Sequence, residues 1–141
     1  MRVLIDANII ADAILTSEER KQGDRHNAQL VLEAVARGRI TGLITPPIFV
    51  LAVQIVKPRR AHHRERVQQA LEFLLDIAEW VPINPDHCRT ALASSFHDVE
   101  DGIEFFACRG PEAIVTRDSD FRDHVNVPVY TAAEFVKKHL K

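Results

Sequence analysis

Five short apolar runs, separated by segments of helical periodicity, place the strongest constraint on how this chain can fold. A continuous apolar run of this length is typical of a buried parallel strand, because such a strand is covered on both faces. In the segments between the runs, apolar residues recur three and four positions apart, as in helices that pack on a sheet. The pattern predicts an α/β fold, namely a three-layer α/β/α sandwich around a central, mainly parallel sheet of about five short strands. The runs cover residues 3–5, 41–45, 80–83, 113–116 and 127–130.

Local signals locate several of the helices. Residues 28–35 and 67–74 have the i, i+3, i+4, i+7 spacing of an amphipathic helix. Thr45, followed by a proline, is typical of a helix cap and predicts a helix to about residue 56. The apolar segment 43–56 fits either the core or a contact with a partner. Trp80, at the start of the third run, is expected to lie in the core.

Composition indicates one globular domain over residues 1–141. The chain is 46% hydrophobic and 27% charged, which is typical of a folded protein with its own core. No apolar run approaches the roughly 20 residues of a membrane span. The first residues lack the layout of a signal peptide, so we expect a cytoplasmic protein without membrane contact. The net charge of −2 does not indicate a nucleic-acid binder, but the basic run 57–66 fits either a solvated helix start or a phosphate-binding surface.

Carboxylates gather where predicted strands end and the next element begins. Asp6 follows the first apolar run directly, and Asp118 and Asp120 follow the fourth. Asp98 and Asp101 are three residues apart at the start of an apolar helical segment, so their side chains share one face of that helix. Sites in parallel sheets form at the carboxyl ends of the strands. Three acidic segments can therefore line one crevice.

Two interpretations of these acids remain open. Each acid alone fits a structural role: Asp98 as a helix cap, Asp101 as a partner of the helix dipole, and the last pair as turn residues. Gathered in one crevice, two carboxylates about 5 Å apart would repel each other by roughly 3 kcal/mol, which a bound cation would offset. Oxygen ligands favour Mg²⁺ or Mn²⁺, and such an ion activates water for attack on a phosphodiester.

Three segments of the chain resemble a known family. They read VLIDANIIADAIL, DVEDGIEFFACRGPEAIVTRDSDF and VPVYTAAEFV. In this order, and across nearly the whole chain, they resemble the PIN domain family, in particular its group of VapC-type toxins. The resemblance implies an endoribonuclease that depends on Mg²⁺ or Mn²⁺. It also implies a toxin of a toxin–antitoxin system that cleaves RNA, forms a homodimer and is held inactive by an antitoxin protein.

The resemblance also assigns roles to individual positions. Three acids are expected to be catalytic: Asp6, Asp101 and Asp118. The metal ligands are expected to include these three and two neighbours, Asp98 and Asp120. Supporting polar residues match at Asn8 and Thr116. Contacts with RNA phosphates are expected from Arg117 and from two residues of the basic run, Arg59 and Arg60.

One position departs from the family pattern. The family normally has a glutamate in the helix after the second strand, and here that position is Leu51, in an apolar stretch. Gln54, one turn later, can support the site with a neutral oxygen but cannot supply the charge. The alternative function is therefore a PIN domain without catalysis that acts as an RNA- or protein-binding regulatory module. A haloacid dehalogenase-type phosphohydrolase would need an aspartate at Asn8, and we set it aside.

Overall fold

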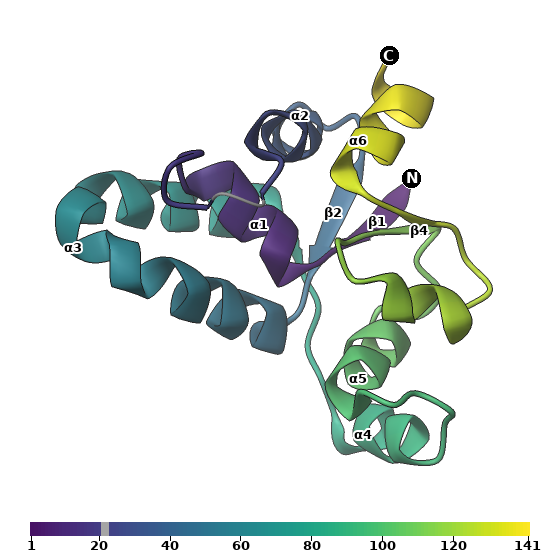
Figure 1. Ribbon diagram of the computed structural model, residues 1–141. Helices are drawn as coiled ribbons and strands as arrows, with labels where there is room; N and C mark the ends of the chain where they lie inside the picture. Colours follow the sequence, from purple (N-terminus) through teal and green to yellow (C-terminus); the bar gives the residue numbers. More distant parts are fainter. Residues whose placement is uncertain (21–22) are drawn as a thin grey trace.

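The computed structural model describes residues 1–20 and 23–141, without the side chains of residues 58–62, and its centre is a five-stranded sheet (Figure 1). All four strand pairings are parallel, and the strand order is β3-β2-β1-β4-β5. The prediction of an α/β fold with a parallel sheet of five short strands is confirmed. The strands are β1 (Arg2–Ile5), β2 (Thr41–Ile44), β3 (Glu79–Trp80), β4 (Ala113–Val115) and β5 (Val129–Tyr130).

Helices cover both sides of the sheet. α1, α2 and α6 lie on one side, and α4 and α5 lie together on the other (Figure 1). This arrangement gives the three layers that the alternation of strands and helices predicts. The helices are α1 (Ala7–Ile14), α2 (Arg25–Ala36), α3 (Pro46–Ile77), α4 (Pro85–Leu92), α5 (Val99–Ala107) and α6 (Ala132–Phe135). Two short elements complete the described chain: the 3₁₀ turn η1 (Ser119–Asp123) and the π-helical turn η2 (Val136–Leu140).

The long helix α3 consists of two helical segments joined at a kink. His63 has φ −138° and ψ 39°, which lies outside the helical region. The helices predicted before and after His63 are therefore both present, and they join at this kink within α3. In the part of the chain that the structure describes, no helix combines the length and apolar character that a membrane span requires.

The first half of α3 has both a core face and an exposed apolar face. The side-chain oxygen of Thr45 accepts a hydrogen bond from the Ile48 N–H at 3.5 Å and caps the helix as predicted. Ile48 and Ala52, one turn apart, are fully buried. Val50 and Leu51, on another face, are 54% and 38% exposed. The apolar segment 43–56 thus contributes to the core and also leaves apolar surface uncovered.

Strand β3 is shorter than the apolar run that predicted it. Trp80 pairs with Ile44 of β2, and the Val81 N–H still donates to the Ile44 carbonyl at 2.8 Å. Pro82 has no N–H to continue the pairing, so the strand ends. Trp80 lies on this edge strand, is 46% exposed and packs edge-to-face on Phe49, with 5.9 Å between ring centroids. The prediction that Trp80 lies in the core was wrong.

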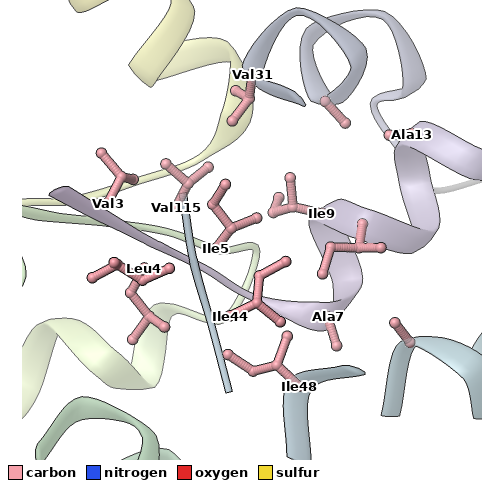
Figure 2. Close-up of a cluster of buried hydrophobic side chains, with 14 of the residues drawn as sticks. Val3, Leu4, Ile5, Ala7, Ile9, Ala13, Val31, Ile44, Ile48 and Val115 are labelled. Atoms are coloured by element: carbon pink, nitrogen blue, oxygen red, sulfur yellow. The ribbon is translucent and has the colours of Figure 1, made fainter. Parts of the chain in front are cut away.

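The core surrounds β1, the central strand. Val3, Leu4 and Ile5 are at most 1% exposed, and they lie among apolar side chains from α1, β2 and β4 (Figure 2). Full burial of such a side chain contributes about 1.5–3 kcal/mol, so the position of β1 is strongly fixed. Asp6 directly follows this strand. The core therefore determines where the first predicted site residue lies.

Candidate active site

The strand order reverses between β1 and β4, and the acidic segments meet beyond the carboxyl ends of these two strands. The chain passes from β1 to β2 on one side, whereas β4 lies on the other side of β1. The Asp6 N–H donates to the Val115 carbonyl at 3.1 Å, so the residues after β1 and β4 are direct neighbours. A reversal of this kind opens a crevice in an α/β sheet. Asp6 and Asp118 lie at that location, just after β1 and β4, as the strand-end rule predicts.

The carboxylate of Asp6 is held by three donors. As the cap of α1, its Oδ1 accepts from the Ala7 N–H at 2.7 Å. Its Oδ2 accepts from the Thr116 hydroxyl at 2.6 Å and from Asn8 Nδ2 at 3.3 Å. Thr116 is 2% exposed, and its hydroxyl oxygen also accepts from the Asp118 N–H at 2.9 Å. Two of the predicted supporting residues, Asn8 and Thr116, therefore join Asp6 to the loop after β4.

Asp98 caps α5, as the structural interpretation predicts, and Asp118, interpreted there as a turn residue, caps the 3₁₀ turn η1. Asp98 Oδ1 accepts from the Glu100 N–H at 3.0 Å at the start of α5. Asp118 Oδ1 accepts from the Asp120 N–H at 2.9 Å at the start of η1. Each cap uses one carboxylate oxygen. Asp120 is exposed, and it contributes its backbone rather than its carboxylate to this contact.

Asp101 and Glu104 lie one turn apart on α5, and no hydrogen bond to either carboxylate occurs within the described residues. Burial raises the pKa of Asp101 to about 7, and the charges of Asp98 and Asp6 add to the effect. Burial likewise raises the pKa of Glu104 to about 9, with further contributions from Asp6 and Asp101. Burial also raises the pKa of Asp6, although its hydrogen bond from Thr116 opposes the shift. Asp6, which follows β1, and the acids of α5 therefore lie close enough for their charges to act on one another.

Two buried acids in this region escaped the sequence analysis. Glu104 continues the three-residue spacing of Asp98 and Asp101, and this spacing was a usable signal. Asp12, on α1, is 1% exposed. Its carboxylate contacts Arg20 Nε and pairs with Arg117 Nε at 3.1 Å. These partners balance the buried charge of Asp12, which no local pattern revealed.

The remaining predicted residues have more peripheral positions. Arg117 pairs with Asp12, its N–H donates to Asn8 Oδ1 at 3.2 Å, and its side chain remains 31% exposed. Gln54 is exposed on α3. Arg59 and Arg60 lie among the side chains outside the described structure.

The donor set fits a hard cation in its chemistry. It consists of carboxylate oxygens that raise one another's pKa, the arrangement that a bound cation stabilises. Within the described residues, no group of three or more His, Cys, Asp or Glu side chains is already arranged to hold a metal ion. The acids therefore do not form a coordination shell in advance of metal binding. The assignment of these residues as metal ligands remains a prediction.

Comparison with known proteins identifies the family. A family model described as a PIN domain matches residues 2–120, and the chain belongs to the PIN domain family, which is generally one of nucleases. A solved structure with a similar fold is the crystal structure of VapBC2 from Rickettsia felis bound to a DNA fragment from their promoter. The match has a TM-score of 0.59 at 18% identity and covers 92% of this chain and 97% of that chain, which establishes the fold. The resemblance to the PIN domain family is confirmed. No curated protein matched.

Proposed function

We propose that this PIN domain is an endoribonuclease that uses Mg²⁺ or Mn²⁺ to hydrolyse RNA phosphodiester bonds. The observation that carries the proposal is the group of carboxylates beyond β1 and β4, which lie close enough to act on one another's charge. There, the charges of neighbouring carboxylates raise the pKa of Asp6 and Asp101 in addition to the effect of burial. A divalent cation would offset this repulsion. Membership of a family that is generally one of nucleases supports the same reaction.

Asp6, Asp101 and Asp118 would hold the cation, with Asp98 and Asp120 in support. Such a cation, when bound, polarises a phosphoryl oxygen and lowers the pKa of a water molecule. The Thr116 hydroxyl and the Asn8 amide keep the Asp6 carboxylate in one orientation through their hydrogen bonds. A fixed orientation of this kind reduces the reorganisation needed to reach the transition state.

Arg117 is the residue that we expect to contact the RNA backbone. It precedes Asp118, and its side chain keeps 31% exposure while it pairs with Asp12. The guanidinium group has several donors, so one can bind Asp12 while another binds a phosphate oxygen. Arg59 and Arg60 of the basic run are further candidates on sequence grounds.

The direct test combines cleavage with metal binding. Purified protein is incubated with a pool of RNAs and Mn²⁺, and Mn²⁺ binding is measured separately by calorimetry without RNA. We expect RNA cleavage that EDTA abolishes. A protein that neither cleaves RNA nor binds Mn²⁺ would overturn the proposal.

A second candidate function is a PIN domain that binds RNA or another protein without cleaving. The residue that favours it is Leu51, which is 38% exposed on α3 at the position where the family normally has a glutamate. Under this alternative, Leu51→Glu supplies the missing charge and raises Mn²⁺ affinity by at least about tenfold, the scale on which changes around a metal site act. Robust and equal Mn²⁺ binding by both forms would count against it.

We further propose an antitoxin protein as a partner, a homodimeric state and a cytoplasmic location. An apolar groove of about 360 Å³ between α1, α2 and the end of α3 supports a protein contact, since its lining includes Ile14, Leu32 and Phe73. Phe73 is 54% exposed there.

Two measurements test the partner and the dimer. Phe73→Asp should prevent co-purification of a co-expressed antitoxin, and the mass of the purified protein in solution tests the dimer. Mn²⁺ binding should be the same in both forms, because the groove does not include the acidic crevice.

A further inference from the structure

We propose that Arg20 and Arg117 together bind one phosphate group of the RNA strand, and that the buried Asp12 is the positioning residue that holds both guanidinium groups. This inference rests on the proposed function, because it concerns a contact with the same RNA substrate. It adds Arg20 to the phosphate contact expected from Arg117 and gives Asp12 a role in binding. The ligand class is a phosphodiester anion.

The carboxylate of Asp12 binds the two arginines through different oxygens. Its Oδ1 contacts Arg20 Nε, and its Oδ2 pairs with Arg117 Nε at 3.1 Å. Hydrogen bonds between charged groups are stronger than neutral ones, and two of them fix the orientation of the carboxylate. The two guanidinium groups therefore lie close together, on either side of one buried acid.

The charge and exposure of these three residues favour an anion as a further ligand. Two guanidinium groups stay protonated in proteins, and one carboxylate balances only one of them. The side chain of Asp12 is 1% exposed, whereas those of Arg20 and Arg117 are 18% and 31% exposed. The part of this group that reaches the surface is thus cationic, and the anionic part is covered. Such a surface attracts a phosphate.

Helix α1 places these arginines beside the proposed cation ligands. Asn8 and Asp12 are one turn apart and share one face of α1. The Arg117 N–H donates to Asn8 Oδ1 at 3.2 Å, and Asn8 Nδ2 donates to Asp6 Oδ2 at 3.3 Å. The Arg117 side chain then reaches Asp12, about 6 Å farther along the axis of α1. A phosphate bound there would belong to a nucleotide near the cleaved bond.

The segment before α2 packs directly against Asp12. The Asp24 N–H donates to Asp12 Oδ2 at 3.4 Å. A Cβ atom at Gly23 would lie 2.6 Å from Asp12 Oδ1, so this close approach requires a residue without a side chain. The fold therefore fixes the position of Arg20 before RNA binds. A group that is already in position loses less conformational freedom on binding.

RNA affinity in EDTA, where the proposed cleavage cannot occur, tests the phosphate contact in the full-length protein. The probe is a fluorescently labelled single-stranded RNA of mixed sequence, and anisotropy measures its binding. For Arg20→Gln we expect an affinity about tenfold lower, the effect of one hydrogen bond between charged groups. The slope of log K against log salt should fall by about 0.7, the value for one phosphate on a single strand.

Arg37→Gln is the matched control, because it removes the same charge from an exposed pair with Glu33 on α2. It should change the affinity less than twofold. An Arg20→Gln variant with unchanged affinity would overturn the inference. A lower affinity with an unchanged salt slope would also overturn it, because that result indicates a structural loss rather than a lost phosphate contact.

Two further variants test the positioning role of Asp12. Asp12→Asn removes a negative charge, which by charge alone would strengthen RNA binding, whereas the loss of positioning weakens it; we expect binding about tenfold weaker. Gly23→Ala keeps every charge but displaces either the Asp12 carboxylate or the segment that carries Arg20, so it should also weaken binding. Binding as tight as that of the wild type in either variant would overturn this role. If circular dichroism shows that Asp12→Asn does not fold, Gly23→Ala decides.

The outcomes for this inference and for the proposed function can be distinguished. A wild-type protein that binds RNA through Arg20, but neither binds Mn²⁺ nor cleaves RNA, overturns the proposed function and leaves the phosphate contact in place. A wild-type protein that cleaves RNA with Mn²⁺, and whose RNA affinity does not change in Arg20→Gln, overturns only the inference. A protein that shows no RNA binding, Mn²⁺ binding or cleavage overturns both.

Discussion

The crevice has two walls that are held in place by different forces. In the wall formed by β1 and the loop after β4, Asp6 accepts three hydrogen bonds and Thr116 connects it to Asp118. In the wall formed by α5, Asp101 and Glu104 are buried to different degrees and have pKa values raised to about 7 and about 9. The first wall is organised by the fold alone. The second is not held by hydrogen bonds, and its acids are partly relieved of their repulsion by protonation.

The largest expected effect comes from breaking the organised wall at its centre. Asp6→Asn removes a proposed ligand charge but keeps the shape of the side chain. We expect RNA cleavage to fall by at least about 100-fold, the upper range for changes just outside a metal shell. Initial rates with Mn²⁺ measure the effect, and calorimetry should show weakened Mn²⁺ binding. Retention of more than a tenth of the activity would contradict the assignment.

Thr116→Val tests the same wall through a residue that does not bind the ion in our proposal. The valine cannot donate to Asp6 or accept from the Asp118 N–H. We expect a loss of about 10–100-fold in Mn²⁺ affinity or activity and about 1–3 kcal/mol in the free energy of unfolding. Thr116→Ser keeps the hydroxyl and serves as the control. Equal activity in the valine and serine variants would show that the hydroxyl is dispensable.

The raised pKa values of the acids on α5 should make the free energy of unfolding depend on pH. In the folded protein Asp101 holds its proton up to about pH 7 and Glu104 up to about pH 9, whereas their ordinary values are 3.8 and 4.5. Between these limits the unfolded chain binds fewer protons than the folded one, so these two groups make stability fall as pH rises.

Denaturant titrations at pH 5, 7 and 9 without metal measure this decrease. Glu104→Gln should reduce the decrease between pH 7 and 9. It should also raise the melting temperature at pH 9, on the order of 3 °C for each kcal/mol gained. An identical pH profile in the variant and the wild type would mean that Glu104 is not the group that titrates.

The smallest effect is expected at Asp120. Its carboxylate is exposed, and its described contact in the site is made by the backbone N–H. Interactions of exposed charges contribute about 0.2–1 kcal/mol, so Asp120→Asn should lower Mn²⁺ affinity by less than about threefold. A larger loss, measured by calorimetry beside Asp118→Asn, would show that Asp120 is a direct ligand.

The organised wall was also the more predictable one. Its strands are continuous apolar runs that end in Asp6 and in the segment Thr116–Asp118, so the pattern of hydrophobicity and the strand-end rule located both. The family resemblance then named the same residues. The local sequence alone determines that these residues follow the ends of their strands.

The features that escaped prediction depend on distant parts of the chain. Asp12 is balanced by Arg117, which is far away in the sequence, and local periodicity contains no trace of this pair. Glu104 is a charged residue on a buried face, which contradicts the pattern used to recognise such faces. Tertiary contacts, rather than local preference, determine how Asp12 is balanced and why Glu104 is buried, although the spacing of Glu104 from Asp101 was visible in the sequence.

The hydrogen bond between Thr116 and Asp6 joins residues that are 110 positions apart. During synthesis on the ribosome, Asp6 and α1 emerge early, but their partners follow only after most of the chain has been made. A nascent chain that has not yet released β4 contains no complete crevice. A nuclease with this topology would therefore be harmless while it is being translated, and its activity would begin only when the last part of the chain folds.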